Sequence, residues 1–260
     1  MQPTIASKPG APPVPNPIRE GFVFEDVGFK YAGSDRWAVR HVNLTIGPGE
    51  RIALVGENGA GKTTLAKLLA RLYEPTEGRI LLDGIDVRDY DLASLRRAIG
   101  VIFQDFVRYD FRFDENIGVG AIDETAPYLD ADRPPDGDRA VPRVIRDAAD
   151  NALASSLLPR LPGRWGQMLG RRFDGGLELS GGEWQKIALA RAYARDAQAL
   201  ILDEPTAALD ARAEYDVFLR FSELMAGRTA VIHSHQLPPL SIAARIVGLR
   251  QGEVQDGGTH

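Results

Sequence analysis

A glycine-rich segment, residues 56–64 (GENGAGKTT), joins two stretches of contrasting pattern. Residues 51–55 (RIALV) are an apolar run that predicts a buried strand, and residues 62–72 carry leucines at helical spacing. A loop of the form GxxxxGK[ST] between a strand and a helix is typical of a polyphosphate cradle. Glycine allows the unusual dihedral angles and the close approach of backbone N–H groups that such a dense anion requires. The segment therefore predicts a phosphate-binding loop in an α/β protein.

The residues at the end of this loop have side chains suited to a magnesium–nucleotide ligand. The Lys62 ammonium can reach the outer phosphates, where charge develops during phosphoryl transfer, and the Thr63 hydroxyl can bind Mg²⁺. We expect the following residues of the loop to contact the nucleotide: Gly56, Asn58, Gly59, Ala60, Gly61, Lys62, Thr63 and Thr64.

A second run, residues 199–202 (ALIL), ends in the adjacent carboxylates Asp203 and Glu204. In sheets of parallel strands, ligands bind beyond the carboxyl ends of the strands, which is where these two side chains are expected. Asp203 is suited to hold Mg²⁺, and Glu204 is suited to polarise a water molecule that attacks the γ-phosphate.

Strand-like and helical patterns alternate along the rest of the chain, which favours a mostly parallel sheet covered on both faces. Residues 22–24 and 42–46 alternate as in an antiparallel edge sheet. Further strands are expected at 80–82, 101–103 and 230–233, and helices at 141–158, 182–194 and 211–225. The acidic stretch 121–139 reads as a solvated surface loop. We divide the chain into a proline-rich linker or tail (1–20), a first core part with a β subdomain (21–104), a helical lobe (105–179) and a second core part (180–260).

Residues 179–185 (LSGGEWQ) resemble the signature motif of ABC ATPases and lie just before the aspartate strand, as in that family. The resemblance implies an α/β P-loop NTPase fold: a RecA-like, mostly parallel core sheet, an N-terminal antiparallel β subdomain and an inserted α-helical lobe. It also implies that Ser180, Gly181 and Gly182 contact the γ-phosphate of ATP bound to a second copy of the chain or a homologous ATPase domain.

Other residues match positions of the same family in the same order. Tyr31 resembles the aromatic residue that stacks on adenine, and Gln104 resembles the glutamine that touches Mg²⁺ or the attacking water. Asp210 resembles the aspartate of the loop that crosses between subunits. The switch histidine has two candidates, of which His235 fits the position after the strand, whereas His233 falls within the strand.

The opening FEDVGFKY, the run LRRAIGVIFQD and the closing IVGLRQGEVQDGGTH resemble exporters whose ATPase domain is fused to a membrane domain. This resemblance implies a transmembrane partner, a location at the cytoplasmic face of the cell membrane, and ATP hydrolysis that powers transport. The chain stops where relatives usually continue into a terminal helix, which favours a fragment of a longer protein over a separate subunit.

Composition narrows the alternatives. The net charge of −5 argues against nucleic-acid binding, and the absence of cysteine excludes disulfides and thiolate zinc sites. No apolar run approaches the length of a membrane span, so we expect this chain by itself to be soluble. The alternatives are the ATPase subunit of an importer, a nucleotide-binding regulator without turnover, and a chromosome-maintenance ATPase. The last class has a long heptad-patterned insertion that residues 105–179 lack.

Overall fold

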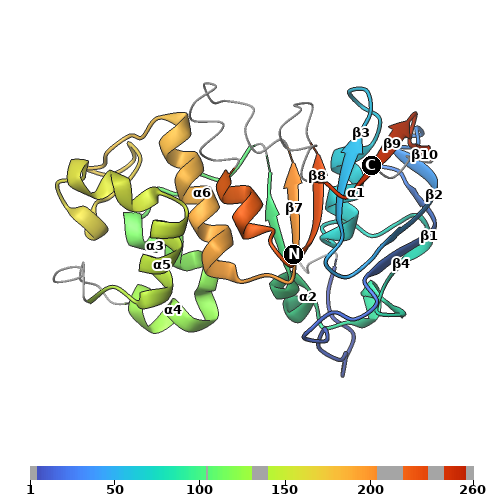
Figure 1. Ribbon diagram of the computed structural model, residues 1–260, viewed down its shortest axis with the longest axis horizontal. Coiled ribbons are helices and arrows are strands. Elements are labelled where there is room, and N and C mark those ends of the chain that lie inside the picture. The colour runs from blue at the N-terminus through green and yellow to red at the C-terminus, as the bar shows by residue number, and fades with distance from the viewer. Residues whose placement is uncertain (1–4, 104, 131–139, 204–218, 234–242, 256–260) are drawn as a thin grey trace. The chain divides into compact units, whose positions relative to one another are not determined.

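The computed structural model describes residues 5–103, 105–130, 140–203, 219–233 and 243–255 (Figure 1). These residues form two compact units. The first contains the described residues up to 103 together with 197–203, 225–233 and 243–255, and the second contains 105–130, 140–196 and 219–224.

The first unit contains a four-stranded antiparallel sheet. Its strand order is β2 (Val39–Ile46), β1 (Phe22–Phe29), β4 (Glu77–Leu82) and β5 (Ile85–Asp86). Phe22 lies opposite Ile46 on one side and opposite Leu82 on the other, which confirms the antiparallel pairing expected from the alternating pattern.

A six-stranded sheet in the same unit contains the strands of the two motifs. Its order is β10 (Glu253–Gln255), β9 (Arg245–Arg250), β3 (Arg51–Val55), β8 (Thr229–His233), β7 (Ala199–Asp203) and β6 (Ile99–Ile102). All neighbouring pairs are parallel except β10 with β9. Every residue of β7 and β8 is buried, which accounts for the apolar residues that make up most of both strands. The mostly parallel core sheet is thus confirmed.

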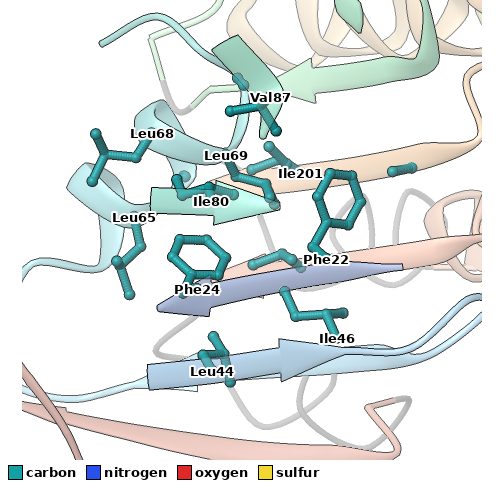
Figure 2. Close-up of a cluster of buried hydrophobic side chains, with 14 of the residues drawn as sticks. Phe22, Phe24, Leu44, Ile46, Leu65, Leu68, Leu69, Ile80, Val87 and Ile201 are labelled. Atoms are coloured by element: carbon teal, nitrogen blue, oxygen red, sulfur yellow. The ribbon is translucent and has the colours of Figure 1, made fainter. Parts of the chain in front are cut away.

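One hydrophobic cluster joins residues of both sheets to α1 (Lys62–Leu69). Figure 2 shows leucines of α1, including Leu65 and Leu69, near Phe24 of β1 and Ile80 of β4. Ile201 of β7 belongs to the same cluster and is 1% exposed. The helix that follows the glycine loop is therefore fixed by packing, which stabilises it more than the propensity of eight residues would.

The proline-rich N-terminal segment, residues 5–20, contains no helix or strand but packs along the first unit. Val14 and Ile18 are each 8% exposed and belong to the hydrophobic cluster. The Val14 N–H donates to Ser94 Oγ at 2.8 Å, at the first turns of α2 (Leu92–Ala98). We call this segment the N-terminal strap.

Gln198, just before β7, fastens the strap with both ends of its side-chain amide. Gln198 Oε1 accepts from the Ile18 N–H at 2.8 Å, and Gln198 Nε2 donates to the Pro15 carbonyl at 2.9 Å. The segment expected as a linker or tail is therefore part of the domain. Proline removes only its own N–H, and the residues between prolines still bond to side chains of the core.

The second unit is helical. Its elements are α3 (Phe113–Gly118), η2 (Val119–Ala121), α4 (Ile122–Leu129), α5 (Arg143–Asn151), η4 (Ala154–Arg160), η5 (Arg164–Gly166) and α6 (Gly181–Arg195). The structure groups α6 with this unit, whereas the sequence division began the second core part at residue 180. The buried face of α6 packs mainly against α3, α5 and η2, which explains the difference.

The acidic stretch expected as a surface loop begins with α4. Asp123 and Glu124 occupy its first turn, where negative charge favours a helix. The Thr125 hydroxyl is buried and donates to the carbonyls of Gly118 and Ala121, at 2.8 and 3.0 Å. This anchoring holds a helix where the acidic composition had predicted a loop. Residues 131–139 lie outside the described part.

A largely buried cation ties α6 to the segment that follows Gln104 in the chain. The Arg191 guanidinium donates to the carbonyls of Asn116 and Val107, at 2.6 and 2.5 Å, and lies 4.6 Å from the ring centre of Tyr109. Burial lowers the pKa of Arg191 to about 10, so the side chain stays charged at neutral pH.

Among the described residues, no helix has both the length and the apolar character needed to cross a bilayer.

We predict that Gln198→Ala releases the strap without unfolding the domain. The substitution removes two hydrogen bonds, each worth about 1 kcal/mol, and leaves the Ile18 N–H without its acceptor. Hydrogen exchange at Ile18 should therefore quicken, while exchange in β7 stays slow. Gln198→Glu keeps the acceptor for Ile18 but not the donor to Pro15. Its exchange rate at Ile18 should therefore lie between those of the wild-type chain and the alanine variant. Unchanged exchange at Ile18 in the alanine variant would contradict this role.

Candidate functional site

The glycine loop begins at the carboxyl end of β3, and its backbone has dihedral angles that side chains disfavour. Gly56 and Gly61 have φ angles of 151° and 106°. A Cβ atom on Gly56 would lie 2.2 Å from the Leu249 carbonyl oxygen, and one on Gly61 would lie 2.5 Å from Val39 Cγ1. Glycine is therefore required at both positions, because neighbouring atoms occupy the space a side chain would need.

The remaining residues of the loop differ in exposure. Asn58 and Gly59 are exposed at its tip, whereas Ala60 is 5% exposed. Lys62 is 4% exposed, and its ammonium donates to the carbonyls of Gly56 and Glu57, at 2.7 and 2.8 Å. The cation thus lies against the first turn of the loop, close to the backbone that is expected to surround phosphate oxygens.

Thr63 and Asp203 are 140 positions apart in sequence, and the fold brings them together. Thr63 Oγ1 donates to Asp203 Oδ1 at 3.2 Å. Asp203 ends β7 and is 5% exposed. A hydroxyl and a carboxylate are the oxygen ligands that Mg²⁺ prefers, and one or two protein ligands are usual because phosphates and waters complete its shell. The chemistry of the pair fits the expected metal.

His233 also contacts Asp203. It ends β8, the neighbour of β7, and its Nδ1 hydrogen-bonds to Asp203 Oδ1. The sequence pattern favoured His235 over this residue, because His233 lies within a strand. The signal that could have found it is the pairing of two adjacent parallel strands, each ending in a polar residue.

Tyr31, the candidate for adenine stacking, lies beside the helix that follows the loop. Tyr31 Oη is 3.1 Å from Thr64 Oγ1. The ring meets Phe29 and Tyr73 edge to face, with centroid distances of 4.9 and 5.4 Å. Thr64 is buried, so it contributes to the loop through this bond and its backbone. The aromatic ring is thereby fixed near the phosphate loop within one unit.

The serine–glycine–glycine helix start belongs to the second unit, as the N-terminus of α6. Ser180 is the N-cap: its Oγ accepts from the Glu183 N–H at 3.4 Å, and the Glu183 carboxylate accepts from the Ser180 N–H at 2.8 Å. Glu183 also pairs with Arg160. Burial works to raise the pKa of Glu183, but the hydrogen bonds from Ser180 and Arg160 outweigh it and hold that pKa below its usual value.

This helix start is accessible. Ser180 is exposed, and a Cβ atom added to Gly181 would meet no heavy atom within 4 Å. Gly182 is partly exposed, whereas Trp184 is 1% exposed and anchors the helix to its own unit.

The remaining predicted site residues lie outside the described part of the chain: Gln104, Glu204, Asp210 and His235. Their expected roles stay predictions. Of the two other histidines, His41 is exposed and hydrogen-bonds to Asp26, and His260 is not described.

Comparison with known proteins agrees with this arrangement. The family model described as "ABC transporter" matches residues 39–207. The chain is 39% identical over 248 residues to the subtilin transport ATP-binding protein SpaT of Bacillus subtilis, which covers 95% of this chain and 38% of that protein. It is 40% identical over 242 residues to the ATP-dependent lipid A-core flippase of Cupriavidus metallidurans, which covers 93% of this chain and 38% of that protein.

A solved structure, that of a bacterial Atm1-family ABC exporter with ATP bound, matches the whole chain with a TM-score of 0.81 and 33% identity. The match covers 42% of the exporter chain. This chain thus spans well under half the length of these relatives. The family match runs from before the glycine loop past the serine helix start to beyond Asp203, and the chain therefore belongs to the ABC transporter family and has the P-loop NTPase fold of ABC ATPases.

Proposed function

We propose that this chain is the domain of an ABC exporter that binds and hydrolyses ATP to power transport. The observation that carries the proposal is the meeting of Thr63 and Asp203 beside the buried Lys62. A hydroxyl, a carboxylate and an ammonium group gather at the edge of a parallel sheet where such folds bind ligands. The alternative of an importer subunit has no observation in its favour, since the matched proteins named above are a flippase, a subtilin transport protein and an exporter.

The described residues bind and orient the nucleotide. Backbone N–H groups of the loop and the N-terminus of α1 face the phosphates, and Lys62 neutralises charge on the outer phosphate oxygens. Thr63 and Asp203 would hold Mg²⁺, which when bound shields the phosphate charge that repels an incoming nucleophile. Tyr31 stacks on the adenine ring and so fixes the nucleotide along its length.

Hydrolysis then depends on residues outside the described part. Glu204 follows Asp203 directly and accepts a hydrogen bond from the attacking water, which orients a lone pair toward the γ-phosphate. His235 and Gln104 hold that phosphate and water in line. Most of the catalysis in phosphoryl transfer comes from such positioning and charge stabilisation.

The exposed start of α6 supports a site completed by a second chain. The Ser180 hydroxyl already accepts the Glu183 N–H, so its proton is left to donate to a phosphate oxygen. The first N–H groups of a helix have no partner within it, so those of Gly181 and Gly182 can also donate. We infer that they bind the γ-phosphate held by the partner's glycine loop, and that Asp210 lies at the same junction.

The chain spans 38% of each curated relative named above, and we propose that a transmembrane domain supplies the rest of the transporter. The ATPase domain would then lie at the cytoplasmic face of the membrane, without a nucleic-acid partner. We propose that the membrane domain selects the transported molecule.

Glu204→Gln should abolish turnover and preserve ATP binding. The amide cannot take up the proton of the attacking water, so hydrolysis should fall at least about 100-fold. Because the bound ATP is not hydrolysed, the variant should accumulate as a dimer. Gel filtration with and without Mg-ATP measures the fraction of dimer. Lys62→Ala is the matched control, because it should weaken ATP binding and give no dimer. Unchanged turnover in Glu204→Gln would reject the assigned role.

Mixing two inactive variants tests whether the site is shared between chains. Lys62→Ala damages the glycine loop, and Ser180→Arg blocks the helix start, so each variant alone should be inactive. In a mixture, each dimer that combines one variant of each kind contains one intact shared site. Turnover should therefore return, up to about a quarter of the wild-type value, which is the value for chains that pair at random. A site built within one chain would show no recovery.

A further inference from the structure

The polar residue at the end of β8 is not used by the scheme above. His233 pairs in register with Asp203, the last residue of β7. The three residues before His233 in β8 are apolar: Ala230, Val231 and Ile232. His233 and Asp203 are 7% and 5% exposed. A buried imidazole is costly unless it is hydrogen-bonded, so its place at this strand end needs a partner.

The partner is the carboxylate that is expected to hold the metal. An ionised carboxylate only accepts hydrogen bonds, so the His233 Nδ1 atom carries the proton and donates to Asp203 Oδ1. Thr63 Oγ1 donates to the same oxygen at 3.2 Å. Two donors from different elements, α1 and β8, therefore meet on one oxygen atom.

We propose that His233 is a positioning residue that fixes the Asp203 carboxylate for Mg²⁺; this inference rests on the ATP-binding function proposed above. A carboxylate on a strand end can rotate about two side-chain bonds. The donor from β8 restricts that rotation, and so fixes where both oxygens of the carboxylate lie. Partners behind a metal ligand typically change metal affinity 10- to 100-fold when they are removed, because they orient the ligand.

The role predicts a specific effect on binding, separate from any effect on folding. ATP binding has a part that needs the metal and a part that does not, since the loop and Lys62 act on the phosphates directly. Loss of His233 should weaken only the first part. A histidine that merely filled space in the core would change the melting temperature and would leave the ratio of the two affinities unchanged.

The experiment measures the equilibrium affinity of the full 260-residue chain for ATP, once with excess Mg²⁺ and once with EDTA. In His233→Leu the ratio of the two affinities should fall about tenfold, whereas the affinity in EDTA stays at the wild-type value. His233→Asn should restore the ratio, because its side-chain amide can donate from nearly the same position as Nδ1. Ile232→Val, a change on the same buried strand, is the control for destabilisation and should keep the ratio.

The outcomes separate this inference from the proposed function. If the wild-type chain binds no ATP, or binds it equally well in EDTA, the proposed function fails. If the wild-type chain shows the metal effect and His233→Leu shows it undiminished, the positioning role is overturned while the function stands. A His233→Asn variant that behaves like His233→Leu would also overturn the positioning role, because the proposal depends on the donated proton.

Discussion

The site depends on the parallel arrangement of three neighbouring strands. β3, β8 and β7 lie side by side, so their carboxyl ends share one edge of the sheet. That edge brings Gly56, His233 and Asp203 close together although nearly 150 residues of chain separate Gly56 from Asp203. Parallel strands need crossover connections, and the helix of one such connection, α1, starts with Lys62 and Thr63. The chemistry of the site is thus a consequence of topology as much as of motif.

Burial explains why these polar groups are so closely interlinked. Lys62 and Asp203 are almost completely buried, and an isolated charge in such surroundings costs several kcal/mol. Lys62 is held by loop carbonyls, and Asp203 accepts from Thr63 and His233. Each partner offsets part of the desolvation cost and also restricts the side chain. A site built in this way has little reorganisation to do when a ligand arrives.

Local patterns predicted the elements that depend on local physics. β3, β7 and the helix after the glycine loop could be predicted because each combines a clear hydrophobic pattern with a boundary residue. The N-terminal strap could not, since its bonds to Ser94 and Gln198 join residues about 80 and 180 positions apart. The same holds for His233, whose contact with Asp203 requires knowing which strands are neighbours. Prediction from the sequence was limited by the distance along the chain between contacting residues, more than by the type of residue.

The start of α6 is suited to the role proposed for it, which is to bind a ligand held by a second chain. The Ser180–Glu183 capping box fixes the first turn, the Arg160 ion pair fixes Glu183, and the buried Trp184 fixes the helix. Ordering flexible groups on binding costs free energy, so a turn that is already ordered retains more of the energy of its contact with phosphate. The capping bonds use the Ser180 hydroxyl oxygen as an acceptor and leave its proton to donate elsewhere. A helix start that is rigid, exposed and rich in donors is what a site completed by a second molecule needs, because that molecule brings the anion and finds the donors already in place.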